Sequence, residues 1–266
     1  MIKYFFKNEL TTIYNGDCLE IMEQLNNENF KIDKIITSPP YNIIRPNSPD
    51  MGYDLYKDRL MTNEQYIDWI IKIFDLYNDI LNENGCVIWN MSYGCENTTL
   101  MSLCIAEIIK RTKFTLADIL IWKKDSAIPN NVSTNKMTRI CEFVYVFCRE
   151  KEFMTFKTNK KIIGKMKHTN QPVYENVFNF FECKNNDKAT ELNKATFSTD
   201  FVKNIIDRYV KNNDVVLDNF GGTMTTSIAC ESRNIKSISI ELSKKQCEYG
   251  VERIKKGIQL DIFGLL

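Results

Sequence analysis

Short apolar segments alternate with amphipathic segments along most of the chain, and this alternation restricts the fold more than any other feature of the sequence. Strands are expected at residues 11–14, 33–37, 86–90, 116–122, 142–148, 215–217 and 237–240. Amphipathic helices are expected at 18–25, 62–81, 98–111 and 201–210, and a further helix begins at 225. This alternation predicts an α/β fold with a doubly wound, mostly parallel, seven-stranded sheet and helices on both faces.

The chain has 266 residues, of which 44% are hydrophobic and 26% charged. A single domain spanning 1–266 is therefore expected, and it has enough apolar side chains to fold by itself. Residues 150–195 lose the periodic pattern and are rich in Lys, Asn and Thr. This segment is expected to form a small insert.

Charge and cysteine content exclude several classes of protein. The net charge is only +1, so a nucleic-acid surface would have to come from local clustering of charge. The nine cysteines include no Cys-x-x-Cys pair, which argues against a zinc site and favours the reducing cytoplasm. No apolar run reaches the roughly 20 residues of a membrane span. A cytoplasmic protein without bound metal is expected.

A glycine-rich turn lies between a predicted strand and a predicted helix at 218–223, with the sequence Asp-Asn-Phe-Gly-Gly-Thr. Glycines allow the backbone to approach a ligand closely, and the helix N-terminus directs its free N–H groups at it. Glu241 ends the next strand, where an acidic side chain can bind the two hydroxyls of a ribose. These features predict a nucleotide-type site, although the glycines alone are also compatible with a tight turn.

The second motif is Thr37-Ser38-Pro39-Pro40-Tyr41, which directly follows a buried strand. The Ser38 side chain and the Pro39 carbonyl can accept hydrogen bonds from an exocyclic amine of a base and so direct its lone pair at a methyl donor. Pro39 and Pro40 hold these acceptors rigidly, and Tyr41 offers an aromatic face to a base that has left the stack. Without further context, a Ser-Pro-Pro turn with a packed tyrosine explains the motif equally well.

Both motifs resemble those of the amino-methylating DNA methyltransferases of the permuted β group, in which the catalytic motif precedes the cofactor motif. Ser38-Pro39-Pro40-Tyr41 is similar to the catalytic motif, and Asp218-Asn219-Phe220-Gly221-Gly222 is similar to the Asp-Pro-Phe-x-Gly cofactor loop. The resemblance covers nearly the whole chain. It implies the Rossmann-like fold of class I methyltransferases, S-adenosyl-L-methionine as cofactor and a bacterial or phage-encoded protein.

The resemblance also implies a set of cofactor-binding residues: Asp17 at the adenine, Thr196 and Ser198 at the methionine end, Glu241 at the ribose, and Asp218, Phe220, Gly221, Gly222 and Thr223 in the loop. Two residues depart from the family pattern. Asn219 stands where proline is usual, and Met224 stands where a glycine is usual. Activity is still expected, and the departures bear on the affinity for the cofactor.

Serine before Pro-Pro-Tyr occurs mainly in the cytosine enzymes of that family, so methylation of the cytosine N4 amine is favoured over the adenine N6 amine. Three alternatives stay open: the adenine reaction, methylation of RNA or protein, and a non-catalytic DNA-binding relative. Methylation at ring carbon 5 needs a cysteine nucleophile, usually beside a proline. No cysteine here follows a proline, which argues against that reaction.

Double-stranded DNA is the expected substrate. Position in the loop after Tyr41 suggests contacts from Arg45, Tyr53 and Arg59, and a basic stretch from Arg149 onward suggests contacts from Lys160, Lys161, Lys165 and Lys167. The same stretch could instead be a solvated basic face.

The sequence also suggests two possible protein partners. The segment Gln259–Phe263 resembles the peptide that docks on the bacterial sliding clamp, for which an extended backbone is expected. Packing on the protein's own sheet is the alternative for this segment. A cognate restriction endonuclease is a further possible partner.

Overall fold

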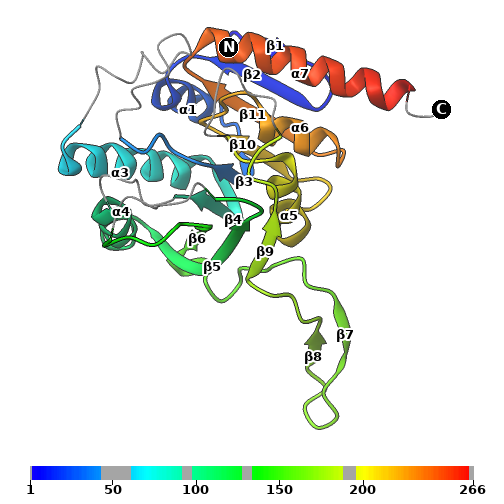
Figure 1. Ribbon diagram of the computed structural model, residues 1–266. Helices are drawn as coiled ribbons and strands as arrows, with labels where there is room; N and C mark the ends of the chain where they lie inside the picture. Colours follow the sequence, from blue (N-terminus) through cyan, green and yellow to red (C-terminus); the bar gives the residue numbers. More distant parts are fainter. Residues whose placement is uncertain (1, 43–60, 92–97, 128–133, 188–195, 264–266) are drawn as a thin grey trace.

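The centre of the molecule is a nine-stranded sheet with the strand order β1-β2-β11-β10-β3-β4-β6-β5-β9 (Figure 1). The computed structural model describes residues 2–42, 61–91, 98–127, 134–187 and 196–263. The strands of the sheet are β1 (Phe6–Lys7), β2 (Thr11–Asn15), β3 (Ile32–Thr37), β4 (Leu81–Asn90), β5 (Phe114–Lys124), β6 (Cys141–Arg149), β9 (Phe180–Cys183), β10 (Val215–Asp218) and β11 (Lys236–Glu241). Neighbours run parallel except β1 with β2 and both neighbours of β6. The seven predicted strands are contiguous within this order, and the prediction missed β1 and β9 at the two edges.

Helices cover both faces of the sheet, as a doubly wound fold requires. Helices α1 (Cys18–Asn27), α3 (Asn63–Ile80) and α4 (Thr98–Arg111) pack on one another along one face. Helices α5 (Thr199–Tyr209) and α6 (Thr225–Glu231) pack together and bury their apolar residues in a separate cluster on the other face. Helix α3 begins where the sequence predicts, because Thr62 and Gln65 form a capping box in which each side chain accepts a backbone N–H of the other.

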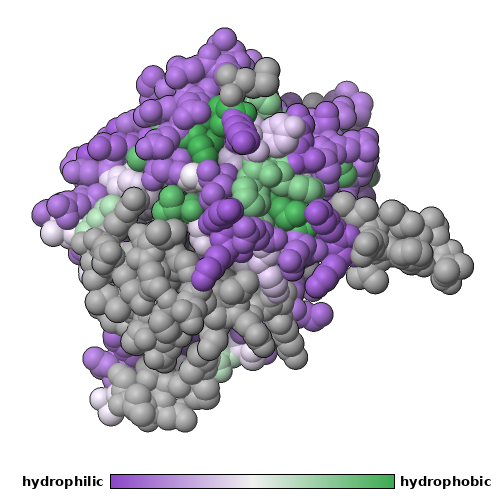
Figure 2. Space-filling model, turned by 90° about the horizontal axis from the view of Figure 1, so that it is seen from above, coloured by the Kyte–Doolittle hydropathy of each residue, from purple (hydrophilic) through white to green (hydrophobic). Residues whose placement is uncertain are grey.

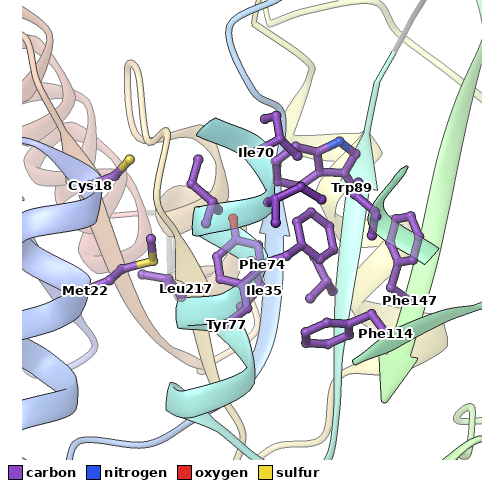
Figure 3. Packing of buried hydrophobic residues seen from close by; sticks show 14 of the residues in the cluster. Cys18, Met22, Ile35, Ile70, Phe74, Tyr77, Trp89, Phe114, Phe147 and Leu217 are labelled. Carbon is purple, nitrogen blue, oxygen red and sulfur yellow. The ribbon is translucent and has the colours of Figure 1, made fainter. Parts of the chain in front are cut away.

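Two hydrophobic clusters, one on each face, hold the layers together. Adjacent strand residues point to opposite faces, so Ile35 joins the cluster under α1, α3 and α4, and Ile36 joins the cluster under α5 and α6. In the first cluster the rings of Phe74, Trp89 and Phe147 meet edge to face (Figure 3). Trp89 and Trp122 are both buried and belong to the core.

Residues 150–183 contain the 3₁₀ turn η1 (Glu150–Glu152), a hairpin of β7 (Ile162–Lys165) and β8 (Pro172–Tyr174), and edge strand β9. The hairpin extends away from the sheet (Figure 1), and every residue from 160 to 174 is exposed. Its exposed apolar side chains include Ile162, Ile163 and Tyr174. A two-stranded hairpin alone is only marginally stable in water.

Arg149 does not belong to the exposed basic stretch in which the sequence placed it. Its side chain is buried at the end of β6, where it donates to the carbonyls of Asn78, Leu81 and Asn82 and pairs with Glu152 at 3.2 Å. Arg149 therefore ties the end of α3 to the end of β6. The exposed charge begins with Glu150 and Lys151 in η1 and continues with the lysines that follow it.

The expectation of an extended C-terminal segment is wrong. The backbone from Lys244 to Phe263 forms one helix, α7, which includes the segment expected to dock on a sliding clamp. This helical backbone differs from the extended backbone that was expected for a docking peptide. None of the helices in the described residues is long and apolar enough to cross a membrane.

Figure 2 shows the molecule from above the view of Figure 1. Hydrophobic residues gather near the centre of that face, and hydrophilic residues surround them.

Candidate active site at the carboxyl edge of the sheet

The two sequence motifs meet at the carboxyl edge of the sheet. Strands β3 and β10 are parallel neighbours, so Ser38 and Asn219, the residues that follow them, leave the sheet side by side. The Thr37 hydroxyl donates a 2.7 Å hydrogen bond to the Asp218 carboxylate and joins the two strand ends directly. In open α/β sheets, ligands bind in the crevice outside the carboxyl ends of the strands. The geometry thus brings the predicted catalytic motif and the predicted cofactor loop into one site.

The segment Ser38-Pro39-Pro40-Tyr41 is held at both ends. The Ser38 and Tyr41 hydroxyls lie 3.2 Å apart, and the Tyr66 hydroxyl of α3 donates to the Pro40 carbonyl at 2.7 Å. Ser38 and Tyr41 are half-buried, whereas Pro39 is buried.

Aromatic rings support the cofactor loop from α3 and β4. Phe220 is half-buried, and its ring lies 5.5 Å from that of Trp69 and 6.3 Å from that of Trp89. Trp69 also contacts Tyr66, the residue that holds Pro40. One group of rings therefore connects the two motifs, and the role of Tyr66 was not predicted from the sequence.

Two buried carboxylates face the cofactor loop. Asp218 accepts hydrogen bonds from Thr37, Thr226 and the backbone N–H of Phe220, and burial raises its pKa. Glu241, only 4% exposed, accepts the N–H groups of Gly222 and Ser243, each at 2.8 Å. Burial raises the pKa of Glu241 to about 7. Both carboxylates lie at the 218–223 loop, where a cationic cofactor with ribose hydroxyls is expected to bind.

Cofactor affinity is expected to rise with pH if Glu241 accepts the ribose hydroxyls. With a pKa of about 7 the side chain is mostly neutral at about pH 6 and mostly ionised at about pH 8. The ionised form is the better acceptor, so the Kd for S-adenosylmethionine should fall about tenfold over this range. Calorimetry at several pH values measures the change. A Glu241→Gln variant should lose the pH dependence, and a Kd in the native protein that is constant or rises with pH would contradict the assignment.

Asn219, which stands where the family pattern has proline, is held by a hydrogen bond from α3. Its side-chain oxygen accepts a 2.5 Å hydrogen bond from the Tyr77 hydroxyl of α3, and both residues are buried. A proline could not accept this bond, and the buried Tyr77 hydroxyl would then lose its partner. Tyr77 is thus the residue that accommodates the departure at 219, and it was not identified from the sequence.

Met224 also has a structural explanation. Its backbone is left-handed, with φ 65°, which accounts for the glycine that is usual at this position. The side chain is fully buried and lies on Gly250 of α7, where an added Cβ would come within 2.2 Å of Met224 Cγ. Gly250 therefore provides the space that Met224 occupies.

A Gly250→Ala substitution is expected to destabilise the protein by about 1–3 kcal/mol, because the new methyl group overlaps Met224. Gly257→Ala is the matched control, since it lies on the same helix with no neighbour within 4 Å of the added Cβ. The control should be neutral or slightly stabilising because alanine favours helix more than glycine does. Urea unfolding compares the two variants. Equal stabilities would contradict the proposed packing, and adding Met224→Ala should restore part of the loss in Gly250→Ala.

Several predicted cofactor residues also have structural partners. The Asp17 side chain caps α1 through the N–H of Leu19, and the Ser198 hydroxyl caps α5 and donates to the Lys184 carbonyl. The Thr223 side chain is buried and accepts a hydrogen bond from Arg253 of α7. Thr196 is half-buried in the segment before α5. Their contacts with a cofactor stay predictions.

The predicted DNA contacts lie in two regions. Arg45, Tyr53 and Arg59 fall outside the described residues. Lys160 and Lys161 follow Asn159, whose side chain donates to the Val210 carbonyl at the C-terminal end of α5. Since α5 begins at the carboxyl edge of β9, these two lysines lie toward the opposite edge of the sheet from Ser38. Two further lysines, Lys165 and Lys167, are exposed on the hairpin.

Comparison with known proteins agrees with this geometry. The family model described as DNA methylase, N6_N4_Mtase, matches residues 32–252. The chain is 27% identical to the type II methyltransferase M.HinfI of Haemophilus influenzae over 96% of this chain and 71% of that protein. Among solved structures, the cytosine-N4-specific PvuII DNA methyltransferase superimposes with a TM-score of 0.70 at 19% identity, covering 97% of this chain and 94% of that one. The complex of M1.HpyAVI with SAM gives a TM-score of 0.63 at 23% identity, covering 92% and 99%.

The fold and the family match together define an S-adenosylmethionine-dependent DNA methyltransferase built on a doubly wound sheet. The family match covers most of the chain. The protein belongs to the N6_N4_Mtase family of DNA methylases, and its substrate is DNA.

Proposed function

We propose that the protein transfers a methyl group to the exocyclic amine of a flipped base in double-stranded DNA, with the N4 amine of cytosine as the preferred acceptor. The observation that carries this proposal is the Thr37–Asp218 hydrogen bond, which places Ser38-Pro39-Pro40-Tyr41 beside the cofactor loop. The serine before Pro-Pro-Tyr favours cytosine, as does the likeness to a methyltransferase described as cytosine-N4-specific.

Bound S-adenosylmethionine supplies an electrophilic methyl group. An exocyclic amine is a poor nucleophile because its lone pair is delocalised into the ring. The Ser38 hydroxyl and the Pro39 carbonyl accept the two amine hydrogens, which favours a tetrahedral nitrogen whose lone pair is free to attack. Tyr41 stacks on the extruded base and keeps it in line with the methyl group. After transfer the amine proton passes through Ser38 to water, so the reaction needs no strong base.

The cofactor is held by residues at the ends of β2, β10 and β11 and by the segment before α5. Glu241 accepts the ribose hydroxyls, and the backbone of Gly221 and Gly222 allows close approach of the ligand. Asp17 contacts the adenine, and Thr196 and Ser198 contact the methionine end. Asp218, Phe220 and Thr223 shape the loop between these groups. The adjacency of β2, β11, β10 and β3 supports this arrangement, because all four are parallel neighbours.

The DNA surface combines the loop after Tyr41, which contains Arg45, Tyr53 and Arg59, with the β7–β8 hairpin. Residues 157–174 of the hairpin region contain five lysines and one histidine and no acidic residue. Such a ribbon suits a phosphate backbone and can enter a major groove. Lys165 and Lys167 would contact phosphates, whereas the position of Lys160 and Lys161 toward the edge of the sheet opposite Ser38 counts against the same role for these two. The segment 150–195 then acts as a recognition insert of a single domain spanning 1–266.

A methyl-transfer assay tests the proposed acceptor. Purified protein, isotopically methyl-labelled S-adenosylmethionine and unmethylated duplex DNA are incubated, and the DNA is digested to nucleosides for mass spectrometry. N4-methyldeoxycytidine is the expected product. N6-methyldeoxyadenosine would overturn the choice of base and leave the chemistry intact, whereas label in RNA or protein but not in DNA would overturn the proposal. A cognate restriction endonuclease and a sliding-clamp contact remain predictions from the sequence, and the helical backbone of 259–263 counts against the second.

A further inference from the structure

The Arg253 side chain of α7 contacts the C-terminal end of the cofactor loop, where the loop leads into α6. Its guanidinium donates to the Thr223 carbonyl at 2.7 Å, to the Thr223 hydroxyl at 3.0 Å and to the Thr225 hydroxyl at 3.1 Å. These bonds fix the point at which the loop becomes helix α6. A single side chain therefore sets how far the end of the loop lies from α7.

The same guanidinium contacts Asp187, which holds a second segment. Asp187 accepts the backbone N–H of Thr199 at 3.0 Å and also its hydroxyl at 3.2 Å, at the N-terminal end of α5. Arg253 donates to this carboxylate at 3.3 Å. The chain of bonds thus runs from the cofactor loop through Arg253 and Asp187 to the residue that follows Ser198.

Both charged side chains are largely withdrawn from water. The Arg253 side chain is 12% exposed and the Asp187 side chain 22%. Burial lowers the pKa of Arg253, and the Asp187 charge opposes this effect. A surface ion pair of this length would contribute little, but a pair this deep that is also bonded to backbone groups restrains what it touches.

We infer that Arg253 and Asp187 are positioning residues that set the separation between the cofactor loop and the Ser198–Thr199 segment, and thereby the affinity for S-adenosylmethionine. The inference rests on the proposed function, because it takes both segments as parts of the cofactor site. Neither residue touches the reacting atoms. Their loss should therefore weaken cofactor binding and leave the methyl-transfer step nearly unchanged.

Arg253→Met tests this inference, with binding measured by calorimetry and turnover measured with saturating DNA. The Kd and KM for S-adenosylmethionine are expected to rise at least about tenfold, while kcat at saturating cofactor stays within about threefold. Arg253→Lys keeps the charge and one donor, so it should recover part of the affinity. Asp187→Asn should also raise the Kd, and the double variant should be less impaired than the sum of the two changes predicts, since both act through one network.

Arg233→Met is the matched control, because Arg233 pairs with Asp207 at 3.0 Å on the exposed surface. It should bind the cofactor like the native protein. All assays are run at a temperature below the thermal unfolding midpoint of each variant. A loss of stability is then not mistaken for a loss of cofactor affinity. An Arg253→Met protein with a lower unfolding midpoint and an unchanged Kd would overturn the inference and leave the proposed function standing. A native protein that binds no S-adenosylmethionine would instead overturn the proposed function.

Discussion

Replacing Tyr41 with alanine is expected to lower kcat about 100-fold while the Kd for S-adenosylmethionine stays within about twofold. Stacking of a base on an aromatic side chain contributes about 1–3 kcal/mol, and an unstacked base is no longer aligned with the methyl group. The substitution also removes the partner of the Ser38 hydroxyl, which lies 3.2 Å from the Tyr41 hydroxyl. Single-turnover methylation of duplex DNA measures the loss, and calorimetry measures the cofactor affinity.

Tyr41→Phe separates the two contributions. It keeps the ring and removes only the contact with Ser38, so kcat should fall about tenfold or less. If Tyr41→Ala methylates DNA as fast as the native protein, the base does not stack on Tyr41. If both variants lose cofactor binding instead, the segment 38–41 belongs to the cofactor site and not to the base site.

The opposite pattern is expected for Glu241→Ala. The Kd for S-adenosylmethionine should rise about 100-fold, because hydrogen bonds to a charged acceptor contribute about 1.5–3 kcal/mol each. The variant should recover most of its turnover when the cofactor is saturating. Equilibrium binding together with a KM titration measures both quantities.

Glu231→Ala is the control for Glu241→Ala, because Glu231 also accepts two hydrogen bonds, from Asn8 and Thr11, each at 2.7 Å. It lies at the far end of α6 from the cofactor loop. Its loss should lower stability without changing the Kd. Equal cofactor affinity in the two variants would show that Glu241 does not bind the ribose hydroxyls.

The central part of the fold could be predicted because its signals are local. Each buried parallel strand is a short run of apolar residues, and each covering helix repeats its apolar residues at helical spacing. These two local patterns were enough to locate seven strands of the sheet and the helices between them. Residues near 40 and 220 could be expected to meet along one rim of the sheet, because each motif follows a predicted strand and parallel strands end at the same edge. The Thr37–Asp218 bond confirms that adjacency.

The edge strands of the sheet and the side chains that support the site could not be predicted, because they depend on contacts between segments that are distant in the sequence. Strand β9 has only four residues, and its place beside β5 is set by pairing and not by a sequence pattern. The hairpin is exposed on all sides, so it has no apolar periodicity. Arg149 looked like the start of a basic stretch because its burial depends on carbonyls about 70 positions earlier in the chain. Arg253 contacts residues 28 to 66 positions away, for which a single sequence gives no signal.

The proposed site can be tested with a crystal structure of the protein with duplex DNA and a non-reactive analogue of S-adenosylmethionine. We expect an extruded cytosine stacked on Tyr41, with its amine between the Ser38 hydroxyl and the Pro39 carbonyl and about 3–3.5 Å from the position of the methyl group. We also expect the ribose on Glu241. A cofactor bound away from the 218–223 loop, or a base that stays in the helix while the cofactor site is filled, would contradict the proposed site.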